Sequence, residues 1–390
     1  MKKDWTYKKL GEVGTVITGS TPSTKDNMNY SSQDVCFFKP SDLSSDSLVK
    51  LSKSEFYISK HAFEHSRKLP KGSVLTTCIG IIGKVGILTE EATCNQQINA
   101  IIPNPDIIIS DFLGYSIMSK KHILQASANA PVVPLLNKTQ FSDFSIPIPP
   151  LSIQRSIVAE LDLLHSVISK KKEQLRELDN LAQSLFYQMF GDIHNKMHLV
   201  DVVPLKDVFS LITDGTHQTP IYTDDKINGF KFLSAKDVVS GVIDWSRTKY
   251  IPKELHEELH KRLSPRRNDI LLCKNGTTGI CALVETDEVF DIYVSLALLR
   301  PKDGILPIYL VYAINNPSTK EQFNSSLKGV GVPNLHLGEI KKAKIPLPPL
   351  SLQQSFAAKV SAIEAQKQAI TQSIHHTEAL LAQRMDQYFG

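Results

Sequence analysis

The stretch IPIPPLSIQ at residues 146–154 returns as IPLPPLSLQ at residues 345–353. Each copy precedes a segment of roughly 40 residues with helical periodicity, much longer than an average globular helix. Both segments end on Phe-Gly, at residues 190–191 and 389–390, so the spacing between the copies is unchanged from end to end. A period this long indicates a duplicated domain rather than a solenoid repeat.

The overall composition is that of a globular protein with more than one domain. The length of 390 residues corresponds to two or three domains. Apolar residues make up 42% and charged residues 22%, which argues against a disordered or fibrous chain. The formal net charge of +4 permits a polyanionic partner without requiring one.

The cysteines and the start of the chain indicate the cellular compartment. The five cysteines are an odd number and form no CxxC pair, so we expect reduced, mostly buried thiols: Cys36, Cys78, Cys94, Cys273 and Cys281. The first residues, MKKDWTYKKL, have no apolar stretch behind their lysines, and no run of about 18 apolar residues occurs. We therefore expect a cytoplasmic protein, neither secreted nor membrane-spanning.

The segments between the repeats also correspond, although more loosely. Residues 8–22, KKLGEVGTVITGSTP, match residues 203–220, VPLKDVFSLITDGTHQTP. Residues 72–88 match residues 268–284. Each segment consists of a run with β-branched residues, a glycine turn and a second apolar run, which predicts a β-hairpin. The two globular domains are therefore expected to share a mixed α/β (α+β) scaffold and to differ in their surfaces.

Both long segments show the heptad periodicity of a coiled coil. Steps of four and three connect Ile157, Leu161, Leu164, Ile168, Lys171, Leu175, Leu178, Ala182, Leu185 and Met189 in the first. In the second they connect Phe356, Val360, Ile363, Lys367, Ile370, Ile374, Thr377 and Leu381. Lys171, Lys367 and Thr377 are the exceptions. Capping is predicted from Ser152 in the first helix and from a Ser351–Gln354 capping box in the second.

Each helix would be about 60 Å long at 1.5 Å per residue, more than one small domain can cover. We predict that the two helices pack on each other in antiparallel orientation, as a rigid spacer between two pseudo-symmetric globular domains. The alternative is that each helix packs along its own domain. The predicted domains are residues 1–148 and 193–347, with spacer helices at 149–192 and 348–390.

The proline-rich PLPPL motif, the long helices, the mixed domains and the duplication resemble the specificity subunit of a type I restriction-modification enzyme. The repeated IPxPPLSxQ and the TDGTHQTP loop carry the resemblance, which covers the whole chain. It implies two target recognition domains that each read one half of a bipartite, asymmetric double-stranded DNA site. It also implies that the spacer binds two methyltransferase subunits, with restriction subunits joining through the complex, and that this chain has no catalytic residue and no cofactor.

A search for catalytic motifs agrees with this expectation. The only double prolines, at 149–150 and 348–349, lie outside an amino-methyltransferase motif, and GIIGK at residues 80–84 lacks phosphate-loop spacing. HEELH at residues 256–260 matches the HExxH zinc-protease signature, but no third ligand follows in helical register. We interpret it as a solvated helix face and predict no metal site.

Candidate DNA-binding residues are basic groups for phosphates and polar groups for base edges. In the first half they are Thr18, Gly19, Ser20, Thr21, Lys25, Arg67, Lys68, Lys71 and Lys84. In the second they are Asp214, Gly215, Thr216, His217, Gln218, Lys261, Arg262, Arg266, Arg267, Lys274 and Asn275. Any one basic run could equally be ordinary solvated surface, but its recurrence in both halves favours DNA.

Aromatic residues gather at the helix ends beyond what a two-helix seam can bury: Phe186, Tyr187, Phe190, Tyr388 and Phe389. We predict that they form an exposed docking patch for partner subunits, with packing inside the chain as the alternative. A different function is also open, namely a coiled-coil adaptor that binds proteins without DNA specificity.

Overall fold

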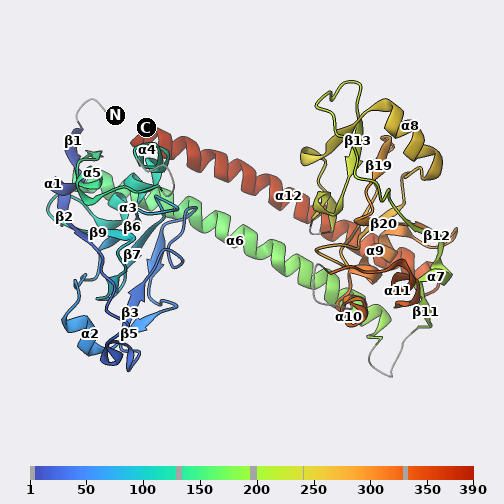
Figure 1. Ribbon diagram of the computed structural model, residues 1–390, viewed down its shortest axis with the longest axis horizontal. Coiled ribbons are helices and arrows are strands. Elements are labelled where there is room, and N and C mark those ends of the chain that lie inside the picture. The colour runs from blue at the N-terminus through green and yellow to red at the C-terminus, as the bar shows by residue number, and fades with distance from the viewer. Residues whose placement is uncertain (1–4, 129–133, 194–199, 240, 328–332) are drawn as a thin grey trace. The chain divides into compact units, whose positions relative to one another are not determined.

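The computed structural model describes residues 5–128, 134–193, 200–239, 241–327 and 333–390 (Figure 1). Residues 1–4 lie outside this range. They belong to the segment MKKDWTYKKL, on which the expectation of a protein that is not secreted partly rests. The chain forms two compact units. Unit 1 comprises Met1–Glu173 and Thr371–Gly390, and unit 2 comprises Gln174–Ile370.

Unit 1 is a mixed unit of short strands and helices. Its strands are β1 (Thr6–Lys9), β2 (Gly14–Thr18), β3 (Val35–Phe38), β4 (Val49–Leu51), β5 (Tyr57–Ile58), β6 (Val74–Thr77), β7 (Val85–Leu88), β8 (Thr93–Cys94), β9 (Ile98–Pro103) and β10 (Ser145–Ile148). Its shorter helices are α1 (Leu10–Val13), η1 (Asn27–Tyr30), α2 (Lys60–Glu64), α3 (Ser110–Ser119), α4 (Lys121–Ala126) and α5 (Lys138–Ser142).

The main sheet of unit 1 has the strand order β2-β9-β6-β7-β4, and a second sheet has the order β5-β3-β8. The predicted hairpin is confirmed, because β6 and β7 pair antiparallel across a turn in which Gly80 and Gly83 have φ of +74° and +87°. Helix α3 packs on β6 and β7 (Figure 1). Between them lies an apolar core that includes the buried side chains of Val74 and Phe112.

Unit 2 is built in the same way. Its strands are β11 (Val202–Pro204), β12 (Phe209–Asp214), β13 (Phe230–Leu233), β14 (Val238–Val239), β15 (Val242–Ile243), β16 (Lys249–Ile251), β17 (Ile270–Cys273), β18 (Cys281–Leu283), β19 (Phe290–Ile292), β20 (Leu296–Pro301) and β21 (Lys344–Pro346). Its shorter helices are α7 (Leu205–Val208), η2 (Ala235–Asp237), η3 (Trp245–Arg247), α8 (Lys253–Arg262), α9 (Pro307–Asn315), α10 (Pro317–Ser326) and α11 (Leu337–Lys342).

The main sheet of unit 2 has the order β12-β20-β17-β18, and its second sheet has the order β16-β13-β19. These strands occupy the same places as β2-β9-β6-β7 and β5-β3-β8 of unit 1. The second predicted hairpin is confirmed by the antiparallel β17–β18 pair. The predicted mixed α+β class and the internal duplication are therefore both confirmed.

The two long segments are continuous helices, α6 (Leu151–Phe190) and α12 (Leu350–Phe389), drawn in green and red in Figure 1. Each contributes to both units. All the predicted heptad residues are buried or half-buried, which confirms the apolar stripe.

The predicted antiparallel orientation is confirmed separately in each unit by contacts between the helices. In unit 1, Glu160 near the start of α6 accepts a hydrogen bond from Tyr388 and forms an ion pair with Arg384, both at the end of α12. Lys172, further along α6, pairs with Glu378 at 2.9 Å. In unit 2, Asp179 pairs with Lys367 at 2.7 Å and Phe186 packs edge-on against Phe356. As residue numbers rise along α6, those of the contacting residues on α12 fall.

Both lysines that interrupt the stripe have polar partners. Lys171 donates to the Ser373 hydroxyl in unit 1. In unit 2, Lys367 bonds to Asp179 and also to Glu364, at 3.0 Å. Burial disfavours the charged form of Lys367, but its bonds to the two carboxylates outweigh this and raise its pKa. The seam thus accommodates both charges.

The start of each long helix differs from the capping prediction. The helices begin at Leu151 and Leu350, so Ser152 and Ser351 lie inside the first turn and are exposed. The last residue of each repeated motif is the anchor instead. Gln154 accepts from the Ile109 N–H at 3.0 Å and donates to Pro149 O, and Gln353 accepts from the Leu306 N–H at 2.9 Å and donates to Pro348 O.

The predicted aromatic docking patch is wrong for three of its five residues. Phe186 and Phe190 are buried in the core of unit 2, and Phe389 is buried in the core of unit 1. Each ring fills space between the helix end and the neighbouring globular domain, where burial of a large apolar side chain stabilises the fold by about 1.5–3 kcal/mol. Tyr187 and Tyr388 are half-buried, and the Tyr388 hydroxyl donates to Glu160.

The cysteines match the expectation of mostly buried free thiols. Four are buried and Cys36 is half-buried. Burial raises the pKa of Cys78, Cys94 and Cys273 to about 12, so these thiols stay protonated at neutral pH. Among the described helices, none combines the length and apolarity needed to cross a membrane.

Candidate nucleic-acid interface

In unit 1, the polar loop after β2 is pressed against the segment after β8. The Gly19 N–H donates to Ile98 O and the Ser20 N–H donates to Cys94 O, both at 2.9 Å. A Cβ at Gly19 would lie 2.1 Å from Asn95 O, so no other residue fits without displacing the backbone. Gly19 is therefore a buried positioning residue, and its prediction as a DNA contact is wrong.

Arg67, the first residue of the first basic run, lies beside this loop. The Arg67 guanidinium donates to Thr18 O, and the Thr93 hydroxyl donates to Arg67 O at 3.1 Å. Arg67 remains exposed despite these bonds, as do Thr21 and Lys25 on the loop. The structure thus brings together two candidate groups that lie far apart in the sequence.

Three amide side chains that the sequence patterns did not single out lie beside this loop, and one of them, Gln96, is exposed. Asn95, Gln96 and Gln97 follow β8, where Gln96 is exposed and bonds to the Thr21 hydroxyl, while the Asn95 amide donates to Gln97 at 2.9 Å. The run NQQIN at residues 95–99, between two apolar strands, was the available signal. Amide side chains present both a donor and an acceptor, as recognition of base edges requires.

Unit 2 repeats the arrangement with different side chains. The Thr216 N–H donates to Ile292 O at 3.1 Å, and a Cβ at Gly215 would lie 2.1 Å from the same oxygen. Arg262 donates to Asp214 O at 3.0 Å, as Arg67 does to Thr18 O. The corresponding loop therefore has the same backbone but presents His217 and Gln218, both exposed.

Four predicted DNA-binding residues in and beneath this loop are buried, and the prediction is wrong for them: Asp214, Gly215, Thr216 and Lys274. The Lys274 ammonium pairs with the Asp214 carboxylate at 2.6 Å, and the two side chains are only 7% and 11% exposed. Gly215 and Thr216 are buried beside them. A buried ammonium needs a carboxylate partner, which explains why Lys274 turns inward rather than towards solvent.

The second basic run is divided between two ends of the main sheet. Lys261 and Arg262 end α8 beside the 214–219 loop, whereas Arg266 and Arg267 precede β17. Strand β20 pairs with both β12 and β17 and so relates the two positions. The start of β17, Ile270, pairs with Leu299 of β20, whereas Asp214, after which the loop begins, pairs with Ala297 of β20. The single cluster expected from the sequence is therefore two separate clusters.

Unit 1 separates its basic residues in the same way. Lys71 precedes β6, and the first residue of β6 pairs with Ile101 of β9. The loop begins after Thr18, which pairs with Asn99 of the same strand β9. Lys84 lies at the loop end of the hairpin but its ammonium donates to Pro40 O at 3.1 Å. Lys68 is exposed, with its ammonium 5.1 Å from the centre of the Phe63 ring.

The remaining candidates of unit 2 are also engaged within the chain to different degrees. Arg267 binds both carboxylate oxygens of Asp287, and both side chains are exposed. Asn275 is half-buried, and its backbone forms an isolated antiparallel β-bridge with Asn334. Lys261 and Arg266 are exposed cations.

The HEELH segment differs from its interpretation as a solvated face. His256 is only 8% exposed and stacks on Phe230 with a ring separation of 3.7 Å. Its Nδ1 lies 2.6 Å from Asp291 Oδ2, and His260 Nδ1 lies 3.4 Å from Asp291 Oδ1. Burial raises the pKa of the Asp291 carboxyl, although both histidines oppose this.

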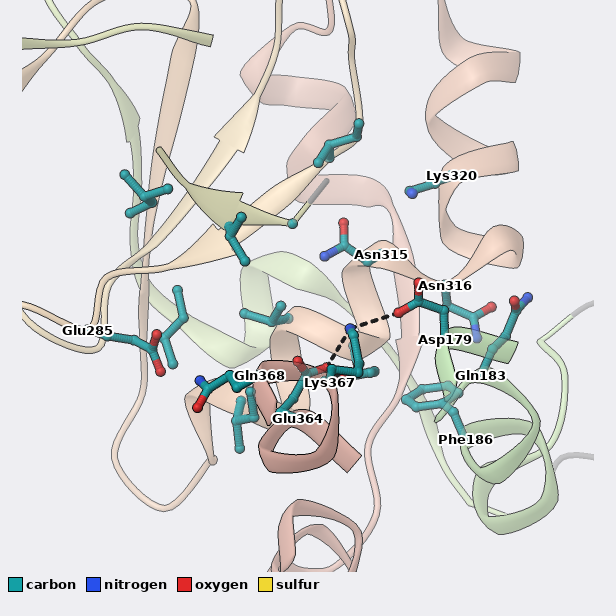
Figure 2. A pocket seen from close by; sticks show the side chains of 18 of the residues that line it. Asp179, Gln183, Phe186, Glu285, Asn315, Asn316, Lys320, Glu364, Lys367 and Gln368 are labelled. Carbon is teal, nitrogen blue, oxygen red and sulfur yellow. Dashed lines mark hydrogen bonds and ion pairs between the residues drawn. The ribbon is translucent and has the colours of Figure 1, made fainter. Parts of the chain in front are cut away.

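A cavity of about 670 Å³ lies elsewhere in unit 2, between the long helices and α9 and α10 (Figure 2). Figure 2 shows Lys367 bound to Asp179 and Glu364 at one wall, with Lys320 and Asn315 further along. Phe186 and Tyr312 supply apolar lining. The cavity has both charge signs in its wall and contains none of the predicted DNA-binding residues.

Comparisons with known proteins agree with the duplicated architecture. The sequence profile described as "Type I restriction modification DNA specificity domain" matches residues 2–180 and again residues 197–377. The MjaIX specificity subunit of Methanocaldococcus jannaschii is 28% identical, over 91% of this chain and 85% of the relative. The EcoBI specificity subunit of Escherichia coli is 23% identical, over 75% of this chain and 66% of the relative.

Solved structures share the fold. The S subunit of a type I restriction-modification system from M. genitalium aligns with a TM-score of 0.55 at 12% identity, covering 99% of this chain and 96% of that one. A chain from a study of assembly and conformational transition of a type I R-M system aligns with a TM-score of 0.60 at 18% identity, covering 98% and 97%. With two matched copies of the profile over most of its length, the chain belongs to the type I restriction modification DNA specificity family.

Proposed function

We propose that this chain gives a type I restriction-modification complex its DNA sequence specificity by reading a bipartite, asymmetric double-stranded target. Residues 1–148 and 193–347 are the two target recognition domains, and residues 149–192 and 348–390 are the spacer helices. One observation carries the proposal: the glycine loop after β2 and that after β12 have the same backbone contacts but present different exposed side chains. Such a pair suits two different half-sites.

The exposed groups divide by the chemistry they offer DNA. Lys25 and Arg67 in unit 1 and Lys261 in unit 2 supply positive charge for phosphates, which positions a protein on the duplex. Thr21, Gln96, His217 and Gln218 supply the hydrogen-bonding groups that discriminate base edges. The buried residues beneath them, such as Lys274 and Asp214, act by holding the loop.

The reaction itself belongs to partner subunits in this proposal. Two methyltransferase subunits bind the spacer helices, restriction subunits join through the complex, and this chain takes no part in bond making. The names of the relatives support it, because they are type I restriction enzyme specificity subunits. Tyr187 and Tyr388 remain candidate partner contacts, since both are half-buried at the helix ends.

Exchange of recognition domains tests the proposal. Cells that express the chain with its methyltransferase partner should show a methylated motif of two short blocks with a fixed gap. Replacement of residues 1–148 by the equivalent domain of a relative should change one block and leave the other and the gap unchanged. An unchanged motif after the exchange would contradict the assignment of that domain, and no motif at all would favour the protein-binding adaptor.

A further inference from the structure

A histidine pair and a carboxylate meet in unit 2, outside the loops described above. His256 and His260 lie one turn apart on the same face of α8, and Asp291 lies on β19, the edge strand against which α8 packs. One ligand-type atom of each residue lies within 4.8 Å of the others. The sequence motif thus has a third potential ligand, which comes from the neighbouring strand rather than from the helix.

The hydrogen bonding of this cluster is incomplete. Asp291 is 2% exposed, and among the described residues neither its Oδ1 nor His260 Nδ1 has a hydrogen-bond partner, although both atoms are buried. A buried carboxylate oxygen without a hydrogen bond is costly, and the ion-pair contact between Asp291 Oδ1 and His260 Nδ1 does not supply one. These two atoms are 3.4 Å apart. Two ligands of a tetrahedral Zn²⁺ ion, each about 2.0–2.1 Å from it, are separated by roughly the same distance.

The donor set indicates the class of ion. Imidazole nitrogen with one carboxylate oxygen suits divalent transition metals such as Zn²⁺ better than Mg²⁺ or Ca²⁺, which prefer oxygen ligands. The His260 side chain is 29% exposed, so water can supply a fourth ligand. Glu257, the catalytic position of the HExxH motif, is exposed and pairs with Lys253 at 3.8 Å, so the motif's general base is directed elsewhere.

Unit 1 contains a natural control for this site. Helix α2 includes His61, and His65 follows at the same spacing, in the place that α8 has in unit 2. On β8, however, Thr93 takes the position of Asp291, because Thr93 pairs with Phe37 as Asp291 pairs with Phe232 in the equivalent sheet. The Thr93 hydroxyl donates to Arg67 O. Among the described residues, the strand position of the carboxylate ligand is therefore occupied by aspartate in unit 2 and not in unit 1, where His61 Nε2 instead lies 3.7 Å from the exposed Asp26 in a preceding loop.

We propose that His256, His260 and Asp291 bind one divalent transition-metal ion of the Zn²⁺ class and that this ion clamps α8 onto β19. The short His256–Asp291 hydrogen bond is exchanged for bonds to the ion when it binds. The clamp has a consequence for the neighbouring surface, because Lys261 and Arg262 are the last residues of α8 and Arg262 bonds to the 214–219 loop. Metal binding thereby orders the basic end of the helix.

Metal titration of the full-length chain tests the site without reference to DNA. After removal of metal with a chelator, Co²⁺ should bind at one equivalent with the visible absorption of a tetrahedral site, and Zn²⁺ should displace it. Zn²⁺ at a hundredfold excess over its Kd should raise the melting temperature by about 5 °C. H260A and D291N should each weaken binding at least as much as the 10–100-fold typical of losing an outer-shell partner.

The double variant H61A/H65A is the matched control and should keep the full stoichiometry. H260A leaves the His256–Asp291 hydrogen bond in place, so this variant decides the question if D291N does not fold. Absence of a Co²⁺ spectrum and of any Zn²⁺-dependent rise in melting temperature in the wild-type chain would overturn the site. So would equal loss of binding in H61A/H65A. Neither result depends on the chain reading DNA.

Discussion

At the scale of single residues, the same residue type has different roles on the two sides of the loop in unit 2. Lys274 is buried against Asp214, whereas Lys261 is exposed at the end of α8. Both are lysines beside a candidate DNA-binding loop. Only the exposed one can exchange hydrating water and counterions for a phosphate, while the buried one stabilises the fold.

Substitution of Lys274 tests its structural role. K274M leaves the Asp214 carboxylate buried without its ammonium partner, so we expect the free energy of unfolding to fall by about 3–5 kcal/mol. Denaturant unfolding followed by circular dichroism measures this change. The double variant K274M/D214N removes both charges and should regain part of the lost stability. A stability change below about 1 kcal/mol in K274M would show that the pair contributes little.

Substitution of Lys261 tests direct contact with DNA. If its ammonium neutralises one phosphate, K261A should reduce the magnitude of the slope of the logarithm of the DNA-binding constant against the logarithm of the salt concentration by about 0.9. Fluorescence anisotropy with a duplex containing the methylated motif, repeated at several salt concentrations, measures the slope. R266A is the comparison, because Arg266 is also an exposed cation but lies at the opposite end of β17. A larger effect from R266A would relocate the DNA-binding surface to that end.

At the scale of elements, the repeated motif acts as a joint between each long helix and its globular domain. The prolines end a short strand, which pairs with β1 or β11, and the final glutamine bonds to a loop that precedes α3 or α9. The motif recurs because both joints need the same contacts. Its glutamine is buried in both copies, at 0% and 2% exposure.

Gln353 and Gln354 offer a matched pair for testing this joint. Q353L removes the partner of the Leu306 N–H and of Pro348 O, so we expect a loss of about 2–3 kcal/mol in unfolding free energy. Q354L changes the exposed neighbour and should alter stability by less than about 0.5 kcal/mol. Thermal and denaturant unfolding of both variants measure the difference. Equal effects of the two substitutions would mean that the buried amide is not an anchor.

At the scale of the whole molecule, the proposed function requires a chain with a formal net charge of only +4 to bind DNA through two domains. If they contact about six phosphates, affinity for a cognate duplex should fall about 10³-fold between 50 and 200 mM salt. Equilibrium binding by the chain with its methyltransferase partner measures this dependence. A duplex affinity that is independent of salt would contradict a phosphate-contacting interface and favour the adaptor.

The sequence by itself determined the duplication, the mixed class, the two hairpins and the antiparallel helix pair. The hairpins and the apolar stripes of the long helices follow from local periodicity: steps of three and four place apolar side chains on one helix face, and apolar runs on either side of a glycine turn pair with each other. The repeated loops after β2 and β12 were also recognised. The hairpins, the heptad stripes and the loops depend on residues close together in the chain, so a pattern within one segment is enough to predict them, whereas the duplication and the antiparallel pairing were inferred by comparing the two halves of the chain.

Tertiary structure alone decided which candidate residues face solvent and which meet. Lys274 turned inward because Asp214 ends a strand two places away in the sheet. Arg266 precedes β17, whereas Lys261 lies at the end of α8 beside the loop. Phe389 was buried by the core of unit 1, and Asp291 reached the histidines only through the pairing of β13 with β19. Burial and charge pairing are set by long-range strand order, which no local pattern specifies.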